Sequence, residues 1–253
     1  MVRPISAGAK EVNGFGIFEN RESAGRALAE ALSTKALPDP VILALPRGGV
    51  PIGAEVAKAL KAPMDLVMVR KIGVPWQPEL AAAAVIDGDD PQIVLNEEVC
   101  MLADVSRTYI DEAAKRELEE IKRRRKLYFD NSPRALIAGR SAIVVDDGIA
   151  TGTTMRAVIR ALRRKNPKSI LLAVPVAPAE TVEALRAEID DVVCLATPEP
   201  FYGIGLHYAD FHQVPDEEVI RILEQVRATK AVETPAKPDE SKKSSTASDQ
   251  SEP

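Results

Sequence analysis

The sequence lacks any apolar run of the roughly 18 residues that a membrane span requires. Its first residues also lack the apolar segment of a secretion signal. The two cysteines, Cys100 and Cys194, lie far apart in the sequence, so their spacing matches neither a zinc site nor a disulfide framework. Together these absences favour a reducing compartment. We therefore expect a cytoplasmic protein with no membrane segment.

An excess of basic charge is also missing. The 253 residues include 33 Lys and Arg against 38 Asp and Glu, which gives a formal net charge of −5. A surface dedicated to nucleic acid is usually strongly basic, so we do not expect nucleic acid as a partner. With 45% hydrophobic and 28% charged residues, the chain has the profile of a globular domain.

The two ends of the sequence differ in composition from its middle. The apolar content of residues 228–253 is four alanines and Val232. Such a segment cannot bury enough surface to offset its ordering entropy. We expect a disordered tail at 228–253, a flexible N-terminus at 1–14 and one domain over 15–227.

Between these ends, short apolar runs alternate with segments of helical periodicity. The expected strands are 41–45, 65–69, 82–86, 93–95, 142–145, 169–174 and 192–195, with 82–86 and 93–95 paired around a turn. The expected helices are 21–32, 50–60, 154–164, 179–187 and 217–226. This alternation is typical of parallel strands joined by helices. The predicted fold class is α/β, with a central, mainly parallel, twisted sheet flanked by helices.

A long helix is predicted for residues 96–128. Glu97 and Glu98 suit its positive N-terminal end, and the basic run at 122–126 suits its negative C-terminal end. Most of these charges are typical of a solvated helix. Five adjacent positive charges repel one another, however, and near a polyphosphate they would have a use.

The segment IVVDDGIATGTTM at 143–155 carries the most information about chemistry. An apolar strand leads into Asp146 and Asp147, which are followed by a loop of small residues and a helix. Backbone N–H groups at such a turn form an anion site suited to a phosphate. Carboxylates just before the loop can accept hydrogen bonds from vicinal hydroxyls. Phosphate on the loop and a diol on the acids together describe a ribose 5-phosphate.

Competing motifs are absent from the sequence. It contains no GxxxxGK[ST] and no GxGxxG, and the adjacent pair Asp146-Asp147 lacks the Asp-x-Asp spacing of an EF-hand. Two neighbouring carboxylates at the end of a buried strand cost energy unless a ligand or cation uses them. A turn with incidental acids is therefore the weaker interpretation.

Residues 143–155 resemble the phosphoribosyl pyrophosphate (PRPP) signature of the type I phosphoribosyltransferases. The resemblance implies that fold, with a small hood at 198–213 and the helix at 96–128 as an insert. It implies that Asp146 and Asp147 are catalytic and hold the ribose 2- and 3-hydroxyls, and that Asp146 is the candidate protein ligand of Mg²⁺. The residues implied around the 5-phosphate are Ala150, Thr151, Gly152, Thr153 and Thr154.

Two further segments resemble the pyrophosphate side of the same family. Residues 45–49 resemble a loop that presents backbone N–H groups to the diphosphate, often through an unusual cis peptide. The residues implied to bind PRPP there are Arg47, Gly48 and Gly49. Arg70 and Lys71 stand where the family places a basic residue facing pyrophosphate. A plain strand-to-helix turn with a solvated arginine is the alternative for 45–49.

Residues 199–211 resemble the aromatic-glycine hood of purine phosphoribosyltransferases. The resemblance implies that Phe201 or Tyr202 stacks on a base and that Asp210 reads an amino group. An aromatic turn packed on the core explains these residues nearly as well. The candidates to close over PRPP from the inserted region are Lys126, Tyr128 and Arg134, and the candidate bases are His207 and His212.

The resemblance covers roughly residues 21–226 and looks most like bacterial stand-alone phosphoribosyltransferase-domain proteins whose acceptor is undefined. It implies transfer of the 5-phosphoribosyl group of PRPP to a nitrogen acceptor in nucleotide metabolism, with release of pyrophosphate and with Mg²⁺ as cofactor. A purine-type base is one candidate acceptor, and a homodimer is a further expectation. The alternative is a non-catalytic PRPP- or nucleotide-sensing regulator, which the basic run at 122–126 keeps open.

Overall fold

A parallel sheet of five strands forms the centre of the molecule. The computed structural model describes residues 17–88, 91–129 and 134–233. Neighbouring strands, in the order β2-β1-β6-β7-β8, are all parallel. These strands are β1 (Pro40–Ala44), β2 (Met64–Leu66), β6 (Ser141–Val145), β7 (Ser169–Val176) and β8 (Asp191–Ala196). The predicted α/β class is therefore confirmed.

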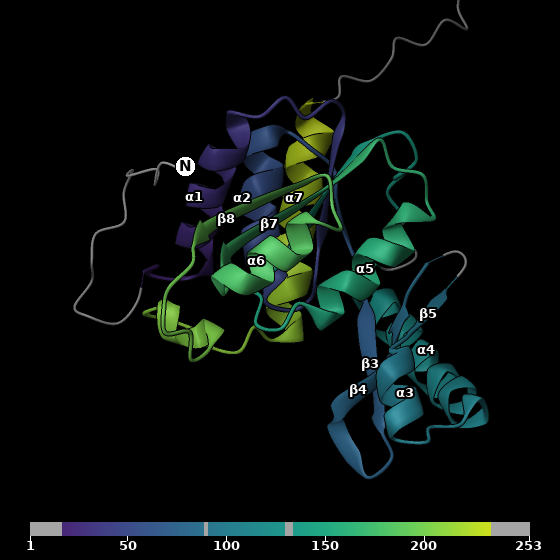
Figure 1. The fold of residues 1–253 in the computed structure, drawn as a ribbon. Coiled ribbons are helices and arrows are strands. Elements are labelled where there is room, and N and C mark those ends of the chain that lie inside the picture. The colour runs from purple at the N-terminus through teal and green to yellow at the C-terminus, as the bar shows by residue number, and fades with distance from the viewer. Residues whose placement is uncertain (1–16, 89–90, 130–133, 234–253) are drawn as a thin grey trace, which may run out of the picture.

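Helices cover both faces of this sheet (Figure 1). They are α1 (Arg21–Ser33), α2 (Gly49–Leu60), α5 (Thr153–Arg163), α6 (Ala179–Arg186) and α7 (Asp216–Glu233). In β1, Ile42 packs with residues of α1 and α2, whereas Val41 and Leu43 pack with residues of α5 and α6. Successive side chains of a strand point to opposite faces. A strand buried on both faces therefore forms a continuous apolar run, which is the pattern that predicts β1.

A second, antiparallel sheet forms a smaller lobe with two helices, at the lower right of Figure 1. Its elements are β3 (Val69–Val74), β4 (Gln77–Ile86), β5 (Gln92–Leu95), α3 (Glu97–Leu102) and α4 (Arg107–Phe129). Ile110 and Ile121 of α4 pack with Ile72 and Val85 of this sheet. The predicted pairing of 82–86 with 93–95 is confirmed, since β4 and β5 are adjacent and antiparallel.

The predicted strand at 65–69 is wrong, because two strands in different sheets share this run. The chain leaves the central sheet after β2 and enters the smaller sheet at β3. At this crossing the Asp87 carboxylate accepts a hydrogen bond from the Met68 N–H at 3.0 Å. Val67 and Met68 are both buried, so the apolar pattern continues across the change of sheet and does not reveal it.

The predicted single helix at 96–128 is also wrong, because it divides into α3 and α4. Asp104 adopts a left-handed conformation with φ 48°, which ends the first helix. The Ser106 hydroxyl then accepts a hydrogen bond from the Tyr109 N–H at 3.2 Å. Such side-chain contacts at a helix start compete with continuation of the preceding helix. Cys100 and Val105 both pack on the small lobe, and they keep the apolar pattern running through the break.

Acidic partners on α4 and in the core offset the charge of the basic run at 122–126. Lys122 pairs with Glu119, while Arg123 and Arg124 both pair with Glu120. Hydrogen bonds from these two arginines lower the pKa of Glu120 to about 2. Arg125 points inward to buried carboxylates. Four of the five basic side chains, Lys122 to Arg125, are thus paired with carboxylates, three of them on α4 and the fourth in the core.

The C-terminal helix extends further than predicted. α7 continues to Glu233, so the predicted helix end at 226 and the predicted start of a disordered tail at 228 are both wrong. Val219, Ile222 and Leu223 anchor the helix in the core. Once a helix is nucleated, further turns form at little cost even without apolar residues. Residues 234–253 and the predicted flexible segment at 1–14 lie outside the described residues.

None of the described helices is both long enough and apolar enough to span a bilayer.

Candidate functional site

The predicted acid pair and the predicted glycine loop meet where β6 and β1 end. These strands are parallel neighbours, so the segments that follow them leave from the same edge of the sheet. A Cβ atom at Gly48 would lie 2.0 Å from Oδ2 of Asp147, and one at Gly49 would lie 2.7 Å from the Val145 carbonyl oxygen. Only glycine permits these approaches. The peptide bond between Pro46 and Arg47 is cis, as the resemblance implies.

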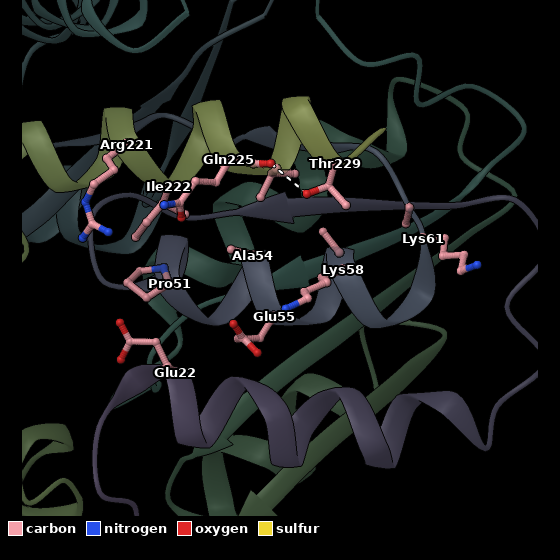
Figure 2. Close-up of a pocket in the computed structure, with 13 residues that line it drawn as sticks. Glu22, Pro51, Ala54, Glu55, Lys58, Lys61, Arg221, Ile222, Gln225 and Thr229 are labelled. Carbon is pink, nitrogen blue, oxygen red and sulfur yellow. Dashed lines mark hydrogen bonds between the residues drawn. The ribbon is translucent and has the colours of Figure 1, made fainter. Parts of the chain in front are cut away.

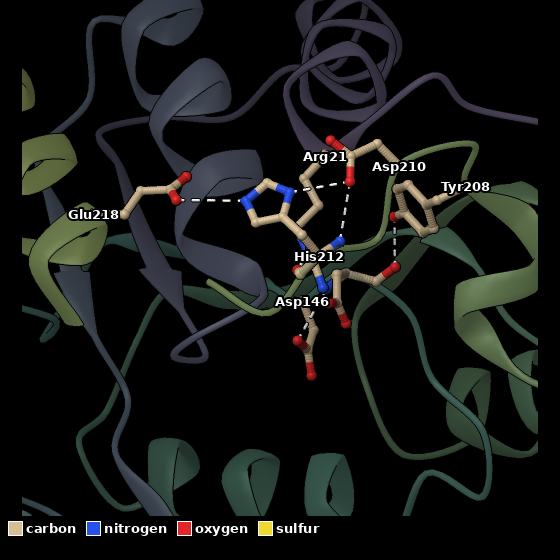
Figure 3. Close-up of polar contacts among 7 residues, drawn as sticks. Arg21, Asp146, Tyr208, Asp210, His212 and Glu218 are labelled. Atoms are coloured by element: carbon tan, nitrogen blue, oxygen red, sulfur yellow. Dashed lines mark hydrogen bonds and ion pairs between the residues drawn. The ribbon is translucent and has the colours of Figure 1, made fainter. Parts of the chain in front are cut away.

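The two adjacent acids form the polar centre of this edge (Figure 3). Asp147 donates its backbone N–H to Oδ1 of Asp146 at 2.9 Å. Burial and the neighbouring charge of Asp147 hold the pKa of Asp146 well above its usual range. Burial also raises the pKa of Asp147, against the opposing effect of Arg21. The protein therefore keeps two carboxyl groups together at an energetic cost, as expected for a binding or catalytic site.

Arg21 is a site residue that the sequence reasoning missed. Its Nε donates to Oδ2 of Asp147 at 2.9 Å, and its Nη1 donates to the His212 carbonyl at 2.8 Å. The guanidinium also lies 3.9 Å from the ring centroid of Phe211. Arg21 is the first residue of α1, where the helix dipole disfavours a cation. That unfavourable placement is the signal that could have identified it.

The loop predicted to surround a phosphate leads directly into α5. Gly152 takes a positive φ of 73° just before the helix begins at Thr153. The Thr181 hydroxyl donates to the Ala150 carbonyl at 2.8 Å and so holds the loop against α6. The first N–H groups of a helix have no partner within the helix. The segment thus presents backbone donors and threonine hydroxyls together, as an anion site requires.

The basic candidates point in different directions. Lys71 lines a cavity of about 530 Å³ together with Thr153 and Thr154 of the phosphate loop. Arg70 instead pairs with Glu117 of α4 at 2.6 Å. Thus the structure brings Lys71 to the candidate phosphate loop, whereas Arg70 is paired with α4. Arg47 lies 3.6 Å from Asp216, at the first residue of α7.

The predicted hood contacts the acids through residues other than those predicted. Phe201 stacks on the His207 ring at a centroid distance of 5.3 Å, and Tyr202 is 80% exposed. Asp210 accepts hydrogen bonds from the backbone and ring of His212.

Among the hood residues, Tyr208 reaches Asp147 and Phe211 reaches Arg21. The Tyr208 hydroxyl donates to the Asp147 carbonyl at 2.6 Å, and Phe211 lies against Arg21. Both contacts join segments distant in sequence, and no local motif predicts them.

Comparison with known proteins decides the family of the chain. Residues 17–209 match the family model of the phosphoribosyl transferase domain. The chain belongs to the phosphoribosyl transferase family. The resemblance stated from the signature at 143–155 is therefore confirmed.

Its relatives agree with this membership. Two Mycobacterium tuberculosis proteins, from strains CDC 1551 and H37Rv, are each 41% identical to this chain over 209 residues, covering 83% of it and 47% of their own length. Their names assign them provisionally to the phosphoribosyl transferases. The crystal structure of TT1426 from Thermus thermophilus superposes with a TM-score of 0.72 at 39% identity, covering 82% of this chain and 98% of that chain. The chain spans about half the length of the curated relatives that it matches.

Two of the three residues suggested to close over PRPP are engaged elsewhere in this phosphoribosyl transferase domain. Tyr128 is buried and donates its hydroxyl to Asp216 at 2.7 Å. Arg134 forms an ion pair with Asp87. Lys126 is exposed on α4. Any closing movement that used Tyr128 or Arg134 would first have to break these contacts.

A second cavity, of about 410 Å³, lies between α1, α2 and α7 of the domain (Figure 2). Its charged lining includes Glu22, Lys58 and Arg221. It contains none of the predicted PRPP or base residues, so we do not assign it to the substrate.

The two histidines of the hood have opposite environments. Among the described residues, Nε2 of His207 is buried without a hydrogen-bond partner, and burial lowers the pKa of His207. His212 contacts Asp210 at 3.1 Å and Glu218 at 3.4 Å, and these carboxylates raise its pKa. At neutral pH the two rings therefore differ in their tendency to hold a second proton.

Replacing Asp210 by asparagine is expected to lower the pKa of His212, because the larger contribution to its rise comes from Asp210. Because the pKa of His212 is raised in the folded state, its contacts stabilise the fold at pH values below the ordinary histidine pKa of 6.5. This stabilisation is lost as the pH rises through the raised pKa. An NMR titration of the imidazole resonances measures the change, with Glu218→Gln as the comparison. Equal pKa values in wild type and Asp210→Asn would contradict this account of the hood.

Proposed function

We propose that this domain transfers the 5-phosphoribosyl group of PRPP to a nitrogen acceptor and releases pyrophosphate. The observation that carries the proposal is the meeting of three features at one sheet edge. They are the acid pair after β6, the glycine loop after β1 and the N-terminus of α5. An acid pair for a diol, between two sites for phosphate groups, matches the chemistry of PRPP.

The acids would act on the ribose ring. In the transfer, the bond from C1 of ribose to the pyrophosphate oxygen breaks and a bond from C1 to the acceptor nitrogen forms. Positive charge develops on the ring as the leaving group departs. Carboxylates of Asp146 and Asp147 fixed beside the ring would stabilise that charge without reorganising at the moment of reaction.

The basic groups would act on the leaving group. Arg47 and the backbone around Gly48 and Gly49 would bind the pyrophosphate, whose negative charge increases as the bond breaks. Lys71, which lines a cavity with Thr153 and Thr154, would bind PRPP from the side of the phosphate loop. In the structure the Asp147 carboxylate lies against Gly48, so the ribose and pyrophosphate subsites would be contiguous. Binding both ends of PRPP would orient C1 toward the acceptor.

Magnesium fits the donor chemistry of this edge. Mg²⁺ prefers oxygen ligands and is usually held by one or two carboxylates together with substrate phosphates. Asp146 would supply the protein carboxylate. No group of three or more His, Cys, Asp and Glu that could hold a metal ion occurs within residues 17–88, 91–129 and 134–233, so most ligands would come from PRPP. The ion would neutralise charge on the pyrophosphate.

The hood would hold the acceptor. Tyr202 is the exposed aromatic residue there, whereas His207 already covers one face of Phe201. An aromatic nitrogen base of the purine type suits an exposed ring for stacking. Asp210 could read an amino group of that base once its contact with His212 is exchanged.

The test is a pyrophosphate-release assay with PRPP, Mg²⁺ and a panel of purines, pyrimidines and other nitrogen acceptors. We expect PRPP to raise the melting temperature of the protein and one acceptor class to accelerate pyrophosphate release. PRPP binding without release for any acceptor would support the sensing alternative and contradict transfer. Absence of PRPP binding would contradict both transfer and PRPP sensing.

A further inference from the structure

Arg21 connects three parts of the site through one side chain. It lies 126 positions before Asp147 in the sequence, at the start of α1. Only 6% of the residue is exposed. Its guanidinium contacts the Asp147 carboxylate, the His212 carbonyl and the face of Phe211. The acid and the hood are thus held by the same cation.

Without those contacts, burying Arg21 at the start of α1 would destabilise the folded protein. A buried guanidinium loses its hydration, and a cation at a helix N-terminus opposes the helix dipole. The carboxylate, the carbonyl and the aromatic face together offset these costs. A feature that violates local helix preferences and is offset only at a functional site is more readily explained by function than by folding.

The contacts also determine which carboxylate oxygens remain open. Arg21 occupies Oδ2 of Asp147, and the Asp147 N–H occupies Oδ1 of Asp146. Within the part of the chain that the structure describes, no hydrogen bond reaches Oδ1 of Asp147 or Oδ2 of Asp146. Among the described residues, each carboxylate thus keeps one oxygen without a partner, which suits the two hydroxyls of a vicinal diol. Gly48 lies directly beside Oδ2 of Asp147, so the carboxylate is confined from two sides.

We propose that Arg21 is a positioning residue for phosphoribosyl transfer, which fixes the Asp147 carboxylate with Oδ1 available to a ribose hydroxyl and joins it to the acceptor hood. This inference rests on the proposed function. Arg21 touches neither PRPP nor the acceptor in this arrangement, and it acts through Asp147. Because the hood supplies two of its three contacts, the ribose and acceptor subsites share one support.

A double-mutant cycle on PRPP binding, measured by titration calorimetry, tests this role. We compare wild type, Arg21→Met, Asp147→Asn and the double variant, with Arg26→Met on the exposed side of α1 as the matched control. Arg21→Met is expected to weaken PRPP binding about 10- to 100-fold, the usual range for a lost hydrogen bond to a charged group. Arg26→Met is expected to leave the affinity unchanged, and Arg21→Lys to recover part of the loss.

The decisive outcome is the loss of PRPP affinity that Arg21→Met causes when Asp147 is already asparagine. If Arg21 acts through Asp147, that loss of affinity is much smaller than in the wild-type background. Equal losses of PRPP affinity in both backgrounds, or wild-type affinity in Arg21→Met, would overturn the inference while leaving the proposed function intact. If Arg21→Met does not fold, Arg21→Lys and Arg21→Gln complete the same cycle. A wild-type protein that does not bind PRPP would overturn the proposed function, and this inference with it.

Discussion

Replacing Asp147 by asparagine is expected to reduce PRPP-dependent pyrophosphate release by about 100- to 1,000-fold, the usual effect of removing one fixed group that stabilises transition-state charge. Asparagine preserves the shape of the side chain but removes its negative charge. The ribose hydroxyl could still be bound, whereas the positive charge developing on the ring would lose its neighbour. Turnover is measured with the acceptor found in the screen.

Asp146→Asn provides the comparison, because the two variants should differ in stability. Burial and the charge of Asp147 disfavour the ionised form of Asp146, as its raised pKa shows, so a neutral side chain there should raise the melting temperature. Burial raises the pKa of Asp147 as well, but Asp147→Asn leaves Arg21 buried without its carboxylate, so this variant should have the lower melting temperature of the two. Both variants should lose turnover. Wild-type turnover in Asp147→Asn would contradict the catalytic role.

The part of the site that the sequence predicts is the part that is continuous along the chain. Asp146, Asp147 and the loop up to Thr154 follow one strand and begin one helix, so their geometry is local. The glycine loop at 45–49 adds one further step, because it follows a strand parallel to β6 and leaves from the same edge. The acid pair and the two loops therefore depend on local backbone geometry, which the residue types in these segments indicate.

The residues that support the site depend on packing between distant elements. Arg21 reaches Asp147 because of the way α1 packs on the central sheet. Tyr208 reaches Asp147, and Phe211 reaches Arg21, because the hood folds back over that edge. A single sequence does not show which of its distant segments lie in contact. It does show a basic residue, Arg21, at the start of α1, where the helix dipole disfavours a positive charge. The same unfavourable placement can be looked for in other sequences.

The errors in the fold have a related cause. At Val67 and Met68 the chain changes sheet while remaining buried, so hydrophobicity does not mark the change. Between α3 and α4 the apolar pattern continues through a left-handed Asp104. In both places the periodicity reports burial, whereas the path of the backbone depends on local polar contacts.

One such set of polar contacts attaches the small lobe to the central sheet. Arg125 of α4 pairs with Asp65 of β2 at 2.9 Å and with Asp87, which follows β4, at 3.4 Å. The Asp65 carboxylate also accepts the Ala135 N–H at 2.8 Å. The side chain of Asp87 is 4% exposed and that of Arg125 is 12% exposed. This network therefore holds the lobe that carries Lys71 against the sheet that carries the acid pair.

Arg125→Met is expected to lower the free energy of unfolding by about 3–5 kcal/mol, the usual cost of removing one partner from a buried ion pair. Methionine retains apolar packing but leaves Asp65 without its cation, whereas Asp87 keeps its contact with Arg134. Urea unfolding measures the loss, with Arg124→Met as the control on the same helix, because Arg124 pairs with a solvated glutamate. Equal losses in the two variants would show that the network contributes no more than a surface pair. A larger loss for Arg125→Met together with weaker PRPP binding would link the attachment of the lobe to the position of Lys71.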